Sequence, residues 1–183
     1  MKKRVLVTGG CGFVGHHVVE HLLKTTDWSV LVFDKLGVAR EIGQLDYIFH
    51  LGAETHVDRS IDDPAPFVMT NVVGTMHLLN FARQVKGLKK FFYFSTDEVF
   101  GPAPKGTDYK EWDRYNSGNP YAASKAGGEE LCLAYGNTYK LPVVITHCMN
   151  IFGERQHSEK FIPKVIRAVM AGEKVVIHSD AQK

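Results

Sequence analysis

The stretch "TGGCGFVG", residues 8–15, decides the fold that we expect for this chain. It matches G-x-x-G-x-x-G through Gly9, Gly12 and Gly15, and it also matches G-x-G-x-x-G from residue 10. Glycines at this spacing allow a tight turn, let a pyrophosphate approach bare backbone and let a strand pack closely on a helix. The N-terminus of the following helix offers free N–H groups to the same anion. The candidate pyrophosphate-binding residues are Gly9, Gly12, Phe13, Val14 and Gly15.

The segments around this loop indicate a dinucleotide site rather than an ordinary glycine turn. An apolar run at 4–9 predicts a strand, and the apolar spacing after the loop predicts a helix over residues 13–24. Asp34 ends the next apolar run, 28–34, about 20 residues on, where a carboxylate can bind the adenosine ribose. A carboxylate there repels the 2′-phosphate of NADP. We therefore expect NAD, with Asp34 and Lys35 beside the ribose.

Apolar runs alternate with helical patterns along the rest of the chain, which is typical of βαβ units and a parallel sheet. The other expected strands span 46–53, 89–96, 141–148 and 174–178. Another expected helix begins after Pro66, with Val68, Val72, Met76 and Leu79 as its inner stripe. Two further expected helices span 119–139 and 159–172. We find no linker or repeat, so the pattern predicts a single α/β domain with a Rossmann-type, doubly wound parallel sheet.

Composition argues against several classes of partner. The 22 basic and 20 acidic residues are mixed along the chain and give a net charge of +2, which does not indicate nucleic-acid binding. No apolar run approaches the roughly 20 residues of a membrane span. Cys11, Cys132 and Cys148 fit neither a disulfide framework nor a zinc site. We therefore expect a cytoplasmic protein without a bound metal.

Tyr121 and Lys125 form the candidate catalytic pair. Their i, i+4 spacing places both side chains on one face of an expected helix. An ammonium beside a phenol favours the phenolate, so we expect Lys125 to lower the pKa of Tyr121 toward that of a useful general base. Y-x-x-x-K often arises by chance as a surface pair, and the glycine loop upstream gives it weight. Ser95 and Thr96 end an expected strand at the sheet edge where ligands of open α/β folds bind.

Six segments in the same order resemble the extended short-chain dehydrogenase/reductase superfamily, which includes the NAD-dependent epimerases and dehydratases, and in particular its nucleotide-sugar 4,6-dehydratases. They are "TGGCGFVG", "HLGAETHVDRSIDDP", "TNVVGTMHLLNFAR", "FSTDEVFG", "NPYAASKAGGEEL" and "FGERQHSEKFIPK". The first segment is common to the whole superfamily. Asp97 and Glu98, directly after Thr96, mark the dehydratase branch.

The resemblance implies a role for each catalytic candidate. Tyr121, supported by Lys125 and Thr96, takes the proton of the sugar C4 hydroxyl while hydride passes to NAD. The resulting ketone acidifies C5–H. Glu98 then removes that proton and a protonated Asp97 donates to the departing C6 hydroxyl. Hydride finally returns to C6. The competing interpretation is that both carboxylates merely lie in a solvated loop.

Further residues carry over from the same resemblance. It places Leu51, Gly52 and Ala53 near the adenosine and pyrophosphate, and Thr55 and Asn71 near the nicotinamide side. The other expected cofactor-binding residues are Ser95, Tyr121 and Lys125. It places Thr96, Asn150, Glu159, Lys160 and Phe161 at a nucleotide-diphosphate sugar. It also implies a homodimer through helices near 67–86 and 119–139, with contributions from Met76, Leu79 and Leu133.

The chain departs from the family pattern in two places. Only residues 35–45 separate two expected strands, so we expect the usual third strand, an edge strand of the sheet, to be lacking. The chain also stops at Lys183, so residues 150–183 would be only the start of a substrate-binding region on the NAD-binding domain 1–183. Two alternatives to the dehydratase stay open: a nucleotide-sugar 4-epimerase, and a non-catalytic NAD-binding remnant of the family.

Overall fold

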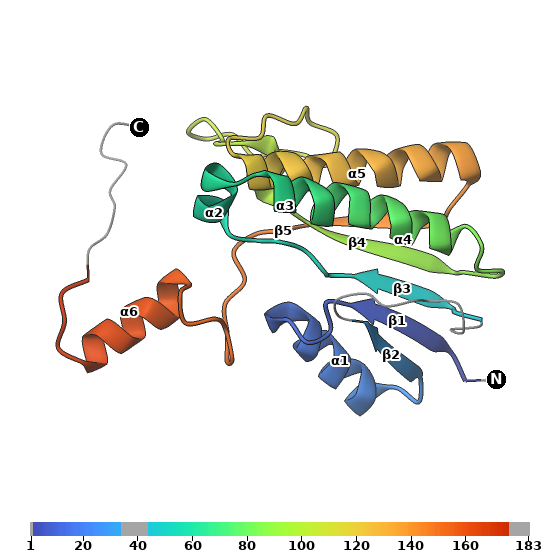
Figure 1. Cartoon of the computed structure of the whole chain (residues 1–183), viewed down its shortest axis with the longest axis horizontal. Coiled ribbons are helices and arrows are strands. Elements are labelled where there is room, and N and C mark those ends of the chain that lie inside the picture. Colours follow the sequence, from blue (N-terminus) through green and yellow to red (C-terminus); the bar gives the residue numbers. More distant parts are fainter. Residues whose placement is uncertain (1, 34–43, 176–183) are drawn as a thin grey trace. The chain divides into compact units, whose positions relative to one another are not determined.

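The structure is a computed structural model that describes residues 2–33 and 44–175 (Figure 1). Its centre is a parallel five-stranded sheet in the order β2-β1-β3-β4-β5. The strands are β1 (Arg4–Thr8), β2 (Ser29–Phe33), β3 (Tyr47–His50), β4 (Lys90–Thr96) and β5 (Val143–Cys148). This order confirms the Rossmann-type sheet. Within the described residues β2 is an edge, as expected for a sheet without the usual third strand.

The helices include two short elements that the sequence did not predict, α2 and η2. The helices of residues 2–33 and 44–175 are α1 (Phe13–Thr25), α2 (Val57–Asp62), α3 (Ala65–Phe67), the π-helical η1 (Val68–Gly74), α4 (Thr75–Ala82), the 3-10 helix η2 (Asp97–Phe100), α5 (Pro120–Tyr139) and α6 (Phe161–Met170). Of the expected strand 174–178, residues 174 and 175 are not in a strand and the rest lies outside the described residues.

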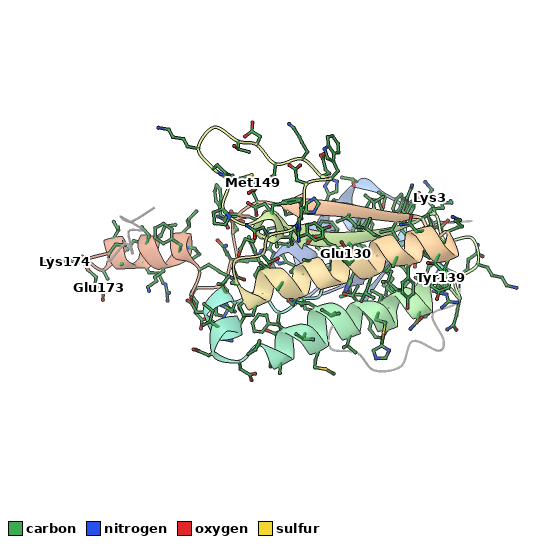
Figure 2. The ribbon with its side chains drawn as sticks, turned by 90° about the horizontal axis from the view of Figure 1, so that it is seen from above. Lys3, Glu130, Tyr139, Met149, Glu173 and Lys174 are labelled. Carbon is green, nitrogen blue, oxygen red and sulfur yellow. The ribbon has the colours of Figure 1, made fainter. Side chains whose placement is uncertain are left out.

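Helices cover the two faces of the sheet unequally. α4 and α5 lie side by side on one face and α1 lies on the other (Figure 1, Figure 2). Side chains alternate along β1, so Leu6 points toward α4 and α5 while Val5 and Val7 point toward α1. The core under α4 and α5 comprises Leu6, Leu45, Ile48, Leu78, Leu79, Ala82, Phe91, Tyr93, Cys132 and Leu141. The core under α1 has Val5, Val7 and Leu22 as its buried members.

The helix that follows Pro66 does not keep the expected inner stripe. Val68 is 47% exposed, whereas Asn71 and Thr75 are buried. The cause is the π-helical segment, in which each turn holds an additional residue and so rotates the later side chains relative to the earlier ones. The expectation is therefore wrong for Val68, although Leu79 is buried as expected.

The chain divides into two compact units, Met1–Met149 and Asn150–Lys183. The second unit contains α6. The side chain of Arg167 on α6 donates a hydrogen bond to the Ser158 carbonyl, and Gln156 Nε2 donates to the Ile151 carbonyl at 3.0 Å. Among the described residues, no helix has the length and apolar character that crossing a bilayer requires.

Candidate active site

The glycine loop is shaped by close backbone approaches. Gly9 has φ +69°, and a Cβ there would lie 2.6 Å from the Gly52 backbone nitrogen. A Cβ on Gly15 would overlap the carbonyl oxygen of Gly9. Because side chains at these positions would force the backbone apart, the loop needs glycine for its geometry.

α1 begins directly after Gly12 without a capping side chain and without an acidic residue in its first turn. Phe13 and Val14 form that first turn. Such a helix end suits an anion, because its backbone N–H groups and its dipole both favour negative charge. Asp34 and Lys35, the predicted ribose-binding residues, lie outside the described residues.

The chain after β3 lies against the start of this loop. The Leu51 N–H donates to the Thr8 carbonyl at 3.1 Å, and the Gly52 N–H donates to the Thr8 hydroxyl at 3.3 Å. Ala53 is partly buried and Thr55 is exposed. The structure therefore brings two of these predicted cofactor-binding residues, Leu51 and Gly52, to the glycine loop.

A buried hydrogen-bond chain starts at the same threonine. Thr8 Oγ1 lies 2.7 Å from His50 Nδ1, and His50 Nε2 lies 3.0 Å from Thr75 Oγ1. The Thr75 hydroxyl in turn donates to the Asn71 carbonyl at 2.7 Å. Burial lowers the pKa of His50 to about 3, and the charge of Lys125 acts in the same direction. His50 is therefore a neutral bridge between β1 and the helix that carries Asn71.

Asn71 extends the chain to the helix of the catalytic pair. Its Nδ2 donates to Ser124 Oγ at 2.9 Å, and the Ser124 hydroxyl donates to the Tyr121 carbonyl at 2.7 Å. The same amide group forms two hydrogen bonds with the backbone of Glu54. Its Oδ1 accepts from the Glu54 N–H at 2.9 Å, and its Nδ2 donates to the Glu54 carbonyl at 3.0 Å. A continuous set of hydrogen bonds thus joins the glycine loop to the first turn of α5.

The phenol of Tyr121 lies among the polar residues at the end of β4. Its pKa is raised to about 12, mainly by burial and also by the charge of Glu98, and a hydrogen bond with Thr96 opposes this rise. The expectation that Lys125 lowers this pKa is wrong for the structure. Burial accounts for the difference, because it disfavours the phenolate more than the nearby groups favour it.

Lys125 directs its ammonium group elsewhere. Its Nζ donates to the Phe94 carbonyl at 2.7 Å and lies 4.2 Å from the centroid of the Tyr93 ring. Only 4% of the residue is exposed, and burial lowers its pKa to about 8. Lys125 therefore links α5 to β4 and is close to losing its charge at mildly alkaline pH.

The two adjacent carboxylates occupy η2, which begins where β4 ends. Thr96 caps this short helix, because its Oγ1 accepts from the Glu98 N–H at 3.3 Å. The same hydroxyl lies 3.3 Å from Asp97 Oδ1. Asp97 and Glu98 are each partly buried. Thr96 thus contacts both acid–base candidates and Tyr121.

Two residues that the sequence analysis missed hold the start of α5. Asn119 donates from Nδ2 to Glu98 Oε2 at 3.0 Å and accepts from the Ala122 N–H at 2.8 Å, so it caps α5 and holds Glu98 at once. Ser60, which is fully buried, accepts from the Tyr121 N–H at 3.1 Å. The Asn-Pro pair at the expected helix start was a signal for the first residue. No local pattern points to the second.

The predicted sugar-binding residues after Thr96 belong to the second unit. Asn150 and Glu159 are exposed, Lys160 is partly buried, and Phe161 begins α6 with 59% of its surface exposed. Asn150 is the first residue of that unit, and Glu159, Lys160 and Phe161 lie further along it.

The fold and this site define a class: a Rossmann-type domain whose glycine turn is tied to a Tyr-Lys helix at the carboxyl edge of a parallel sheet. Residues 5–183 match the family "NAD dependent epimerase/dehydratase". The chain belongs to this family.

Known proteins similar to the chain include both dehydratases and epimerases. dTDP-glucose 4,6-dehydratase of Escherichia coli is 34% identical over 98% of this chain, which spans 63% of that relative. The structure of dTDP-glucose 4,6-dehydratase from Streptomyces venezuelae, solved with NAD bound, is 37% identical, with a TM-score of 0.85 over 92% of this chain and 62% of that one. UDP-N-acetylglucosamine 4-epimerase from Methanobrevibacter ruminantium is 29% identical, with a TM-score of 0.87 over 100% of this chain and 68% of that one.

Proposed function

We propose that the chain is an NAD-dependent nucleotide-sugar 4,6-dehydratase, or the larger part of one. The observation that carries this proposal is the acid–base pair on η2, because Glu98 is hydrogen-bonded to the residue that caps the Tyr121 helix. Dehydration needs one proton removed and one donated close together, and a 4-epimerase has no such need. The named dehydratases among the similar proteins support the same choice.

The residues around the glycine loop fit NAD. Gly9 and Gly15 leave room for a pyrophosphate against bare backbone, and the uncapped start of α1 offers N–H groups to it. When bound, NAD would accept hydride from the sugar C4 and return it to C6. We propose that Asp34 and Lys35 bind the ribose, and that Leu51, Gly52, Ala53, Thr55, Asn71 and Ser95 complete the cofactor site.

The reacting protons are assigned to side chains of this chain. Tyr121 receives the C4 hydroxyl proton, and the Thr96 hydroxyl shares that hydrogen bond. Glu98 removes the C5 proton of the ketone, and Asp97 delivers a proton to the departing C6 hydroxyl. With a pKa of about 12, the phenol has to be activated further when ligands bind. Lys125, on the same helix, donates to the Phe94 carbonyl and would have to turn toward the phenol to take part in this activation.

A direct test mixes the purified chain with NAD and either dTDP-glucose or UDP-glucose, and analyses the products by mass spectrometry. The dehydratase yields a 4-keto sugar that has lost one water. The epimerase yields an isomer of unchanged mass, and a non-catalytic remnant binds NAD without forming either product. An isomer or no product would contradict the proposal.

Variants separate these outcomes further. Glu98→Gln should slow water loss by about 10²- to 10⁴-fold, the contribution expected of a general base, whereas an epimerase would not respond to it. Tyr121→Phe should abolish both reactions. Tyr139→Phe, at the end of α5 and 47% exposed, is the matched control and should keep wild-type turnover.

Three accompanying proposals concern the whole molecule. Residues 150–183 form the start of a substrate-binding region, with Asn150, Glu159, Lys160 and Phe161 meeting the nucleotide-diphosphate sugar. The protein is a homodimer through the helices near 67–86 and 119–139, segments that contain α4 and α5. Leu133 is exposed enough to contribute, but Leu79 is completely buried and the expectation for it is wrong. Cys11, Cys132 and Cys148 are odd in number and widely spaced, a pattern that does not suit a disulfide framework, and this supports the reducing cytoplasm as the location.

A further inference from the structure

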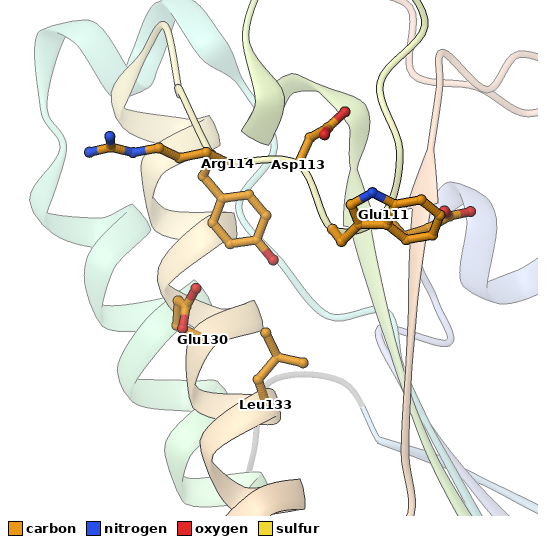
Figure 3. A pocket seen from close by; sticks show the side chains of 7 residues that line it. Glu111, Asp113, Arg114, Glu130 and Leu133 are labelled. Carbon is orange, nitrogen blue, oxygen red and sulfur yellow. The ribbon is translucent and has the colours of Figure 1, made fainter.

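A buried carboxylate that the proposed chemistry does not use lies one turn beyond Lys125 on α5. Glu129 is completely buried, although a carboxylate is costly to remove from water unless donors surround it. The next residue, Glu130, is exposed and lines a surface hollow together with Arg114 and Leu133 (Figure 3). The two adjacent glutamates therefore differ sharply in environment while they share one helix.

Side chains from three different segments point at the Glu129 carboxylate. The Ser95 hydroxyl donates to Oε1, the Tyr115 hydroxyl donates to Oε2 at 2.6 Å, and His147 Nε2 lies 2.8 Å from Oε2. The two hydroxyls act as donors to the carboxylate, and the His147 ring nitrogen faces the same oxygen as the Tyr115 hydroxyl. Burial and the bond to Glu129 raise the pKa of Tyr115, which keeps its hydroxyl protonated.

These donors lie at both ends of η2. Ser95 directly precedes Thr96, the residue that caps η2. At the other end, the rings of Tyr115 and His147 pack on Phe100, with centroid distances of 5.7 and 4.8 Å. Phe100 is the last residue of η2 and is 5% exposed. One carboxylate therefore contacts residues that hold the beginning and the end of the acid–base segment.

We propose that Glu129 is a positioning residue, whose carboxylate fixes both ends of η2, and with them Asp97 and Glu98, relative to α5. Glu129 acts through Ser95 and Phe100 and not on the reacting atoms. The inference rests on the proposed function, because it assigns Glu129 a role in the second half of that reaction.

The first test compares hydrogen–deuterium exchange of the amides in residues 97–101 in Glu129→Gln and Glu130→Gln. Glutamine offers a single acceptor oxygen, and its NH₂ group opposes a donor, so at least one of the donors loses its partner. We expect exchange in this segment to become about 10-fold faster in Glu129→Gln, the factor typical of losing a hydrogen bond to a charged group. Glu130→Gln should match the wild type. Unchanged exchange in Glu129→Gln would overturn the proposal.

The second test separates the two halves of the reaction. Glu129→Gln should still bind NAD and reduce it when dTDP-glucose is added, since Tyr121 and Lys125 perform that step. Water loss, which needs Asp97 and Glu98 in place, should slow by about 10-fold, so reduced coenzyme accumulates and is detected by its absorbance. Equal loss of both steps would mark a general structural defect and overturn the proposal.

A milder variant protects the test against misfolding. Tyr115→Phe keeps the ring against Phe100 and removes one donor, so exchange should rise by a few-fold at the end of η2 nearest residue 100. If this variant exchanges like the wild type, Glu129 does not hold that end. If the wild-type chain forms neither product nor reduced coenzyme, the proposed function fails, and the exchange comparison still decides the role of Glu129.

Discussion

The two faces of the sheet differ in how completely their side chains are buried. The face under α4 and α5 carries most of the fully buried core and also the hydrogen-bond chain that reaches Tyr121. On the face under α1, the buried core is small, and Phe49, Phe92 and Phe94 are only partly buried. Phe49 and Phe92 stack on each other at 4.6 Å, with 4° between their planes.

This difference shows where precise geometry is needed. The catalytic candidates stand on α5 and at the end of β4, and both elements pack in the well-buried layer. Close packing and satisfied polar groups hold side chains in single positions. The α1 face contributes the glycine loop, whose shape depends on backbone contacts rather than on a large core.

Neighbouring phenylalanines in β4 give the largest expected contrast. Phe91 is fully buried on the α4 and α5 face, whereas Phe92 is partly buried on the other face. Phe91→Ala should cost about 4 kcal/mol of unfolding free energy, because it leaves a cavity in the core. Phe92→Ala should cost about 1–2 kcal/mol, from partial burial and one stacked pair. Urea denaturation of both variants measures the two costs, and equal costs would remove the distinction between the faces.

Local patterns predicted the sheet and the glycine loop because both depend on residues close in sequence. The apolar runs predicted all strands of the described sheet, and the glycines at 9, 12 and 15 predicted the turn. The order of the strands followed from the general rules for such folds, together with the short connection at 35–45.

The missed features depend on residues that are distant in sequence. His50 bonds to Thr8, 42 residues away, and Glu129 bonds to Ser95, 34 residues away. Neither partner can be chosen from spacing, because each position has many possible neighbours until the strands are placed. The pKa of Tyr121 was missed for the same reason, since its burial depends on how α5 packs on the sheet.

An intermediate effect is expected from the buried imidazole of His50 on the α4 and α5 face, which makes the unfolding free energy depend on pH. The pKa of His50 falls from 6.5 to about 3 on folding, so the unfolded chain binds a proton in this range that the folded chain does not. Stability is therefore complete above pH 6.5 and decreases as the pH falls toward 3, by about 2 kcal/mol at pH 5. His50→Gln should flatten this dependence between pH 7 and 5, as measured by denaturation at each pH.

The control for this prediction is an exposed histidine on one of the helices that cover the same face of the sheet. His77 lies on α4 and is exposed. His77→Gln should keep the acid sensitivity of the wild type, because this substitution leaves the hydrogen bonds of His50 to Thr8 and Thr75 intact. A flattened pH dependence in His77→Gln, or an unchanged one in His50→Gln, would show that the buried bridge is not its source.

The smallest expected effect involves a lysine over two stacked rings on the α1 face. Trp28 and Tyr47 stack at 4.8 Å, and Lys3 Nζ lies 4.9 Å from the Trp28 ring centroid. A partly exposed cation over an aromatic ring contributes about 0.5–1 kcal/mol, so Lys3→Gln should lower the unfolding free energy by that amount. Lys2→Gln, one residue earlier and exposed, should change it by less than about 0.5 kcal/mol. Equal losses in the two variants would mean that general charge, and not contact with the stacked rings, sets the contribution of Lys3.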